Sequence, residues 1–122
     1  MSKEVSENIA KMYNSLTNNT KIAGKLVADS DIRIDGEILG DLSCNGKVVI
    51  GENGYIKGSI SCICAEIIGT IDGDIIASES VILRSTAEIK SDVYTKRMII
   101  EPKARFVGFC SLTNLDKNSA KE

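Results

Sequence analysis

The residues of this chain best suited to metal chemistry are its four cysteines, but their spacing argues against a metal site. They are Cys44, Cys62, Cys64 and Cys110. Zinc sites combine thiolates with imidazoles, or use cysteine pairs separated by two residues. This sequence has no histidine, and its closest cysteines are separated by one residue. We therefore expect no metal ion and interpret the cysteines as small packing residues.

Paired aspartates are the remaining candidates for catalysis. Asp29 and Asp31 flank an apolar segment, as do Asp72 and Asp74, so alternation along a strand points their side chains outward into solvent. β-helical acyltransferases and carbonic anhydrases need an imidazole as a base or a metal ligand. We predict no catalytic residue and no cofactor. A β-helical enzyme that uses carboxylates or cysteines on an open wall is the alternative.

Composition excludes several partners. The chain has 122 residues, enough for a single domain, and carries 15 basic and 17 acidic residues. This balance lacks the basic patch of a nucleic-acid-binding protein, so we expect no nucleic acid as a partner. No apolar run is long enough for a membrane span, and no secretory leader is recognisable, so we expect a cytoplasmic protein.

A six-fold repeat between Ile22 and Cys110 must position all of these side chains. Each copy is an apolar residue, a small residue two positions later, and a second apolar residue two positions after that. The copies begin at Ile22, Ile38, Ile56, Ile71, Ile89 and Phe106. Their spacings of 16, 18, 15, 18 and 17 residues are too short for a helix pair or a propeller blade. They fit one winding of a parallel β-helix with three sides.

Alternation within the repeat predicts three stacked walls with aliphatic side chains inside. The first wall is led by Leu26, Leu42, Ile60, Ile75, Val93 and Cys110. The second contains Ile32, Ile34, Val48, Ile50, Ala65, Ile67, Val81, Leu83, Met98 and Ile100. The third is led by Ile38, Ile56, Ile71, Ile89 and Phe106. The fold class is therefore all-β, a solenoid of about six triangular windings.

The repeat divides the chain into one domain and two tails. We predict a β-helix over residues 20–113, with flexible tails at 1–19 and 114–122. Apolar residues in the first tail have helical spacing, which leaves a short amphipathic helix open as an alternative to a disordered leader. Such a helix would make these residues a membrane or partner contact: Val5, Ile9, Met12 and Leu16.

The ends of the solenoid are the first candidate functional site. An open end exposes unpaired backbone and core side chains, which must be capped or must meet another molecule. Both phenylalanines of the chain lie in the last copy, Phe106 facing inward and Phe109 outward. We predict contact surfaces for another molecule at both ends, made by Phe106, Phe109, Cys110 and Leu112 at one end and Ile22 and Leu26 at the other.

A second candidate is an apolar stripe on the outer face of the second wall. We predict that Val49, Ile68, Ile82 and Ile99 share this position in four windings, after Arg33 in the first. Exposed apolar stripes usually mark interaction sites. The stripe would support lateral association of filaments. The alternative is a monomeric or small-oligomer adaptor that binds a partner peptide there.

Three segments of the repeat resemble the bactofilins, a family of bacterial polymer-forming cytoskeletal proteins. They are residues 33–42 (RIDGEILGDL), 49–58 (VIGENGYIKG) and 100–108 (IEPKARFVG). The resemblance implies a right-handed β-helix and a homopolymer that assembles without nucleotide into non-polar filaments, with like ends together. It makes the contact surfaces at the two ends a polymerisation interface, and it implies that the aromatic at Phe106 is needed for polymerisation.

The same resemblance implies a scaffolding role in cell shape or envelope organisation. It makes cell-envelope proteins candidate partners. It also adds the inner face of the cytoplasmic membrane as a location, although the first tail here is longer and more polar than the apolar start of membrane-bound relatives.

Overall fold

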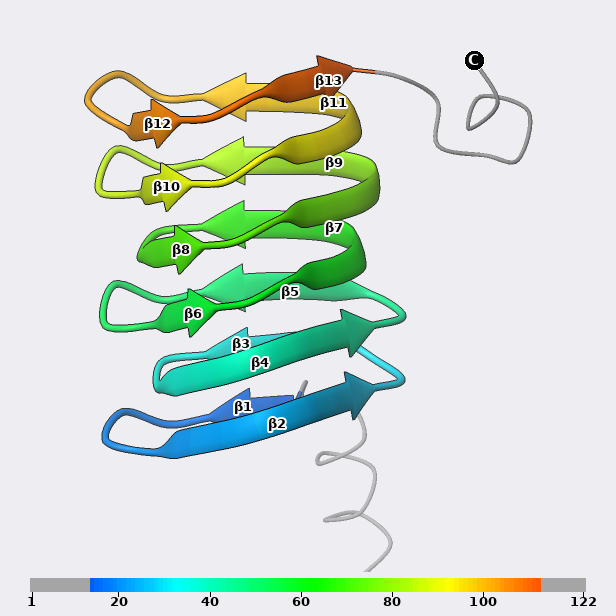
Figure 1. The fold of residues 1–122 in the computed structure, drawn as a ribbon, viewed down its shortest axis with the longest axis vertical. Coiled ribbons are helices and arrows are strands. Elements are labelled where there is room, and N and C mark those ends of the chain that lie inside the picture. The colour runs from blue at the N-terminus through cyan, green and yellow to red at the C-terminus, as the bar shows by residue number, and fades with distance from the viewer. Residues whose placement is uncertain (1–13, 113–122) are drawn as a thin grey trace, which may run out of the picture.

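The computed structural model describes residues 14–112, which form a single β-helix of stacked windings (Figure 1). Within this range there are thirteen strands and no helix. The chain rises along the long axis of the molecule, crossing from left to right on the near side and returning on the far side, which makes the solenoid right-handed (Figure 1). The all-β, right-handed β-helix expected from the sequence is confirmed.

Some strands are short and cover a single wall, whereas others continue around a corner from one wall to the next. They are β1 (Asn14–Leu16), β2 (Lys21–Ala28), β3 (Ile32–Ile34), β4 (Glu37–Cys44), β5 (Lys47–Ile50), β6 (Tyr55–Lys57), β7 (Ile60–Ile67), β8 (Thr70–Asp72), β9 (Ile75–Leu83), β10 (Glu88–Lys90), β11 (Val93–Ile100), β12 (Arg105–Val107) and β13 (Cys110–Leu112). Each winding visits the second wall, then the third, then the first. Every pairing between these strands is parallel.

The register confirms the three walls. On the third wall Ile38 pairs with Ile56, which pairs with Ile71, and the same ladder continues to Ile89 and Phe106. Residues in these ladders between the two ends are fully buried, because each lies between identical positions of the windings on either side. The core is therefore a set of aliphatic columns that run along the solenoid axis.

Glycine is required where the third wall bends into the first. Gly40, Gly58, Gly73 and Gly108 all have φ between 143° and 149°, a region that a side chain disfavours. A Cβ on Gly58 would also lie 1.8 Å from the carbonyl oxygen of Gly40 in the preceding winding. Ser91 takes this position in the fifth winding without a positive φ, so the corner of that winding accepts a side chain.

The structure corrects the predicted N-terminal boundary. β1 begins at Asn14 and pairs with β3, so the β-helix starts six residues before the predicted position 20. Leu16 is half-buried against the core and is not part of a helix. The three-residue strand Asn-Ser-Leu has one apolar side chain, too few for alternation to reveal it. Val5, Ile9 and Met12 lie outside the described residues, as does the segment 113–122.

Candidate functional site: the two ends of the β-helix

The C-terminal end is formed by the last winding, which comprises the second half of β11 together with β12 and β13. Among the described residues β12 pairs only with β10, and β13 pairs only with β11. One edge of each strand therefore presents backbone N–H and C=O groups without a strand partner. Such an edge pairs readily with another chain.

Side chains that face inward on this winding are exposed only because no further winding covers them. Ile100 is 49% exposed, whereas Leu83, its register partner one winding earlier, is fully buried. Leu112 is 60% exposed, whereas its partner Thr95 is fully buried. Phe106 is likewise half-buried above a buried isoleucine. One more apolar layer would bury all three.

Cys110 lies at the bottom of the C-terminal end face. Its thiol lies 3.1 Å from the sulfur of Met98 across the interior of the last winding. Burial raises the pKa of the Cys110 thiol above its ordinary value. The side chain therefore stays neutral at physiological pH and behaves as an apolar residue of the end face.

Phe109 points outward on the first wall, as predicted, but the structure corrects its assignment to the end interface, because its side chain lies beside the end face and not on it. Its ring is 59% exposed and contacts Tyr94 of the preceding winding, with centroids 6.4 Å apart and ring planes at 58°. Its backbone N–H donates a hydrogen bond to the carboxylate of Asp92 at 3.2 Å. Phe109 therefore borders the end contact from the side.

The N-terminal end is hollow. Leu16, Ile22 and Leu26 line a depression of about 400 Å³. Each is half-buried, whereas the residues paired with them in the second winding, Ile34, Ile38 and Leu42, are almost completely buried. Ile22 and Leu26 thus lie together at this end as predicted.

Three end-face residues were missing from the predicted interface. Met98 and Ile100 were placed on the inner face of the second wall, but they were not recognised as its last, uncovered layer. Leu16 was assigned to the N-terminal tail. A count of windings from the last repeat copy could have found Met98 and Ile100 in the sequence. Leu16 could be found only through the pairing of β1.

The predicted stripe on the second wall is wrong at one position. In the register Val49 pairs with Glu66, and Glu66 pairs with Ile82, so Ile68 does not belong to the stripe. Ile68 follows the end of β7 and lies in the corner toward the third wall. A carboxylate therefore interrupts the apolar residues, because the second wall of the fourth winding places Ala65 and Ile67 inward.

Glu66 belongs to a row of ion pairs that crosses four windings. Its carboxylate lies 3.0 Å from Lys47 and 2.9 Å from Arg84, and Arg84 also lies 2.7 Å from Glu101. Partial burial alone would raise the pKa of Glu66, but the hydrogen bonds from Lys47 and Arg84 outweigh burial and hold it below its ordinary value. The outer face of the second wall therefore carries this row of ion pairs, with Val49, Ile82 and Ile99 lying among the charged side chains.

The cysteines and aspartates are placed largely as the sequence suggested. Cys44 and Cys62 are buried packing residues, and burial raises the pKa of the Cys62 thiol to about 12. The four aspartates of the two pairs are exposed. Between residues 14 and 112 no three potential metal ligands come together, and no helix there is long and apolar enough to cross a membrane.

These features, a solenoid core and two uncovered apolar ends, agree with a comparison to known families. Residues 14–111 match the family model for bactofilins, described as polymer-forming cytoskeletal proteins. This chain belongs to the bactofilin family. Its relatives include bactofilins BacO and BacP of Myxococcus xanthus, which are 29% and 30% identical to it over 87 residues, 71% of this chain. The chain spans 69% of BacO and 36% of BacP.

Solved structures of the family share the fold. The bactofilin of Thermus thermophilus, reconstructed by cryo-electron microscopy as double helical filaments, matches with a TM-score of 0.77 and 26% identity. That match covers 80% of this chain and 96% of the other. A crystal structure of a mutant of the same protein, in which arginine replaces a phenylalanine, matches with a TM-score of 0.70 and 24% identity over 74% of this chain. It covers the whole of the other chain.

Proposed function

We propose that this bactofilin is a cytoskeletal scaffold that polymerises end to end, without nucleotide, into non-polar filaments. The observation that carries the proposal is the contrast between the two end layers and the layer beneath each. Inward side chains at both ends are half exposed, whereas identical positions one winding further in are buried. Stacking two molecules would restore this burial and complete the backbone ladder.

End-to-end contact between folded chains is favourable by itself, without a coupled reaction. Burial of aliphatic side chains and pairing of strand edges are favourable without a coupled reaction, so no nucleotide is required. Like ends meeting across a twofold axis bury the same patch twice. A filament built from alternating contacts of the two kinds has no polarity. The role is thus structural rather than catalytic.

In this proposal two filaments wind together, as in the Thermus thermophilus relative. The filaments lie in the cytoplasm at the inner face of the cytoplasmic membrane, where they support cell shape or envelope organisation through cell-envelope proteins. The family resemblance supports this cellular role. Fluorescence microscopy of a tagged chain tests it, and a uniform signal away from the envelope would contradict the membrane-proximal location.

Phe106→Arg tests the assembly mechanism, with Val107→Arg as the matched control. Phe106 faces the end layer, whereas Val107 is exposed on the outer face of the same strand. An arginine at position 106 places a charge between two apolar layers, where it cannot be solvated. We expect filaments of the wild-type and Val107→Arg proteins by negative-stain electron microscopy, and small folded species of Phe106→Arg.

The size of that small species decides how the ends are paired. With like ends together, Phe106→Arg blocks only the C-terminal contact, so light scattering should show a dimer joined through the N-terminal ends. If unlike ends met, blocking one of them would leave a monomer. Filaments of normal length from Phe106→Arg would overturn the polymerisation mechanism itself.

A further inference from the structure

The outer face of the first wall carries a depression in its second and third windings. One register ladder on this face runs through Val27, Ser43, Ser61, Ile76, Tyr94 and Ser111. Ser43 and Ser61 have small side chains, whereas Val27 and Ile76 on either side of them project and are exposed. The result is a hollow of about 510 Å³.

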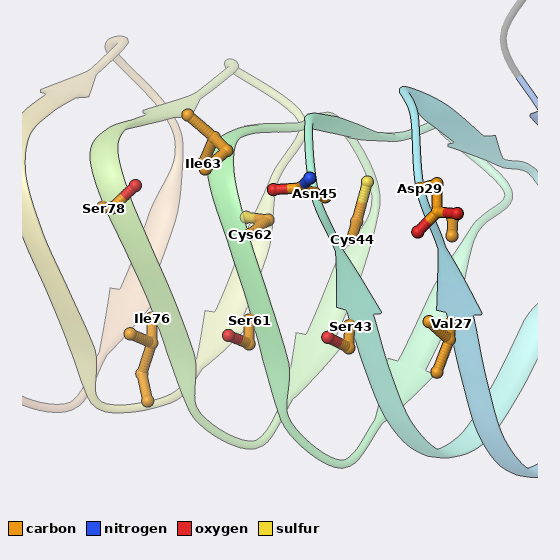
Figure 2. Close-up of a pocket in the computed structure, with 11 residues that line it drawn as sticks. Val27, Asp29, Ser43, Cys44, Asn45, Ser61, Cys62, Ile63, Ile76 and Ser78 are labelled. Atoms are coloured by element: carbon orange, nitrogen blue, oxygen red, sulfur yellow. The ribbon is translucent and has the colours of Figure 1, made fainter.

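Both apolar and polar groups line this hollow. In Figure 2 the side chains of Ser43 and Ser61 lie in one row between Val27 and Ile76, and Cys62 and Ile63 lie in the row above. The hydroxyls of Ser43 and Ser61 make no hydrogen bond with any residue between 14 and 112. The hollow thus offers aliphatic sides and free hydroxyl groups, which suits an aromatic ring with a polar tip.

A projection of that kind lies on the same wall, three windings further along. Tyr94 continues the ladder of the hollow, and Phe109 of the next winding packs against its ring. Phe109 is more than half exposed, and no other aromatic ring contacts this pair in the described part of the chain. A half-buried tyrosine and an exposed phenylalanine in contact, on the same wall as a lined hollow, mark a surface that contacts another molecule.

We propose that the first walls of two copies pair face to face and antiparallel, so that the Tyr94–Phe109 pair of each copy enters the serine hollow of the other. The hollow is centred between the second and third windings, and the aromatic pair between the fifth and sixth. A twofold axis beside Ile76 in the fourth winding exchanges the two positions. This inference rests on the proposed filament and names the surface through which two filaments pair.

A second copy fits this surface better than an unrelated partner, because projection and hollow occupy positions that one twofold axis relates. Such a self-complementary patch is the mark of an isologous contact. A non-polar filament already has twofold axes perpendicular to its length, so antiparallel neighbours preserve its symmetry. Parallel pairing would instead place hollow against hollow. Phe109 also borders the end contact, which makes the lateral and axial interfaces continuous.

Acidic residues beside the ladder oppose the pairing only weakly at physiological salt. Asp74 and Asp92 are exposed on the same wall and would face the partner copy. At an ionic strength of about 0.15 M the screening length is about 8 Å, so repulsion between such exposed carboxylates is small. The pairing should therefore be assayed at this ionic strength.

The test is a charge exchange in the full chain, read by cryo-electron microscopy of the filaments. Ser61→Arg fills the hollow with a cation, and Tyr94→Glu replaces the projection with an anion. We expect each single variant to form single-stranded filaments with the wild-type axial repeat. We expect the double variant to regain paired filaments, because antiparallel pairing brings position 61 of one copy to position 94 of the other.

Matched controls separate pairing from folding. Ser85→Arg and Tyr55→Glu make the same substitutions at exposed or half-buried positions off the first wall, and their filaments should stay paired. Paired filaments in both single variants, or no rescue in the double variant, would overturn the inference. Wild-type filaments that stay single would overturn it too and would assign the hollow to a different occupant, such as a partner peptide. Failure of the wild-type protein to polymerise would instead overturn the proposed function.

Discussion

Replacement of Ile100 by alanine should weaken polymerisation by an amount that follows from its exposure. Ile100 faces the end layer and is 49% exposed, so about half of its burial remains to be gained on contact. The substitution removes three carbons at about 0.8 kcal/mol each when fully buried, or about 1.2 kcal/mol for the half gained on contact. Two copies meet across the twofold axis, so each C-terminal contact loses about 2.4 kcal/mol.

This loss converts directly into a change in critical concentration. Each subunit makes one C-terminal and one N-terminal contact and therefore carries half of the C-terminal loss, about 1.2 kcal/mol. Since about 1.4 kcal/mol corresponds to a factor of ten, the critical concentration should rise about sevenfold. The measurement is the protein concentration left in the supernatant after filaments are sedimented by ultracentrifugation.

Ile99 provides a control whose side chain differs from that of Ile100 only in the direction in which it points. It is the preceding residue, is also 49% exposed, and points outward on the second wall. Ile99→Ala should leave the critical concentration unchanged within about twofold, a shift of about 0.4 kcal/mol. Thermal unfolding of both variants confirms that the chains remain folded. Equal increases for the two variants, or no increase for Ile100→Ala, would refute the assignment of the end face.

Two further predictions concern stability of the solenoid. Gly58→Ala should destabilise the fold by about 3 kcal/mol or more, because the new Cβ collides with Gly40 and the φ of this position is unfavourable for a side chain. In the control variant Gly24→Ala the new Cβ meets nothing within 4 Å, so only the unfavourable φ should cost stability, about 1 kcal/mol. Equal losses of unfolding free energy for the two variants in chemical denaturation would contradict this. Because the folded-state pKa of Glu66 is depressed, its stabilisation is present above the ordinary pKa of about 4.3 and is lost as the pH falls through the folded value. Glu66→Gln should therefore flatten the fall in melting temperature below about pH 4.5, and an unchanged profile would exclude the ion pairs as its cause.

Most of the fold could be predicted because its core obeys a short local rule. Alternation assigned Ile38, Ile56 and Ile71 to one column, and the register shows that column directly. The rule fails where a strand carries too few apolar residues to show alternation. The error at Ile68 has a different origin, because alternation already points Glu66 outward between the inward residues Ala65 and Ile67, and Ile68 lies in the corner after β7. β1 escaped prediction because Asn14 and Ser15 resemble a polar tail.

The candidate sites divide in a similar way. The sequence indicated that Phe106 lies at one end of the solenoid, since the last repeat copy is also the last layer. It did not indicate that Ile100 belongs to the same face, because exposure at an end depends on which strand receives no partner.

The sequence by itself determined the period, the inward residues and the family. A β-helix repeats one local pattern, and each winding requires only its neighbours. The tertiary structure decided which side chains surround each position of the repeat. The depression at Ser43 and Ser61 (Figure 2) and the projection at Tyr94 and Phe109 come from different windings, and only the strand register places them on one wall. Residues far apart along the chain become neighbours through strand pairing, and surface shape arises from those neighbours.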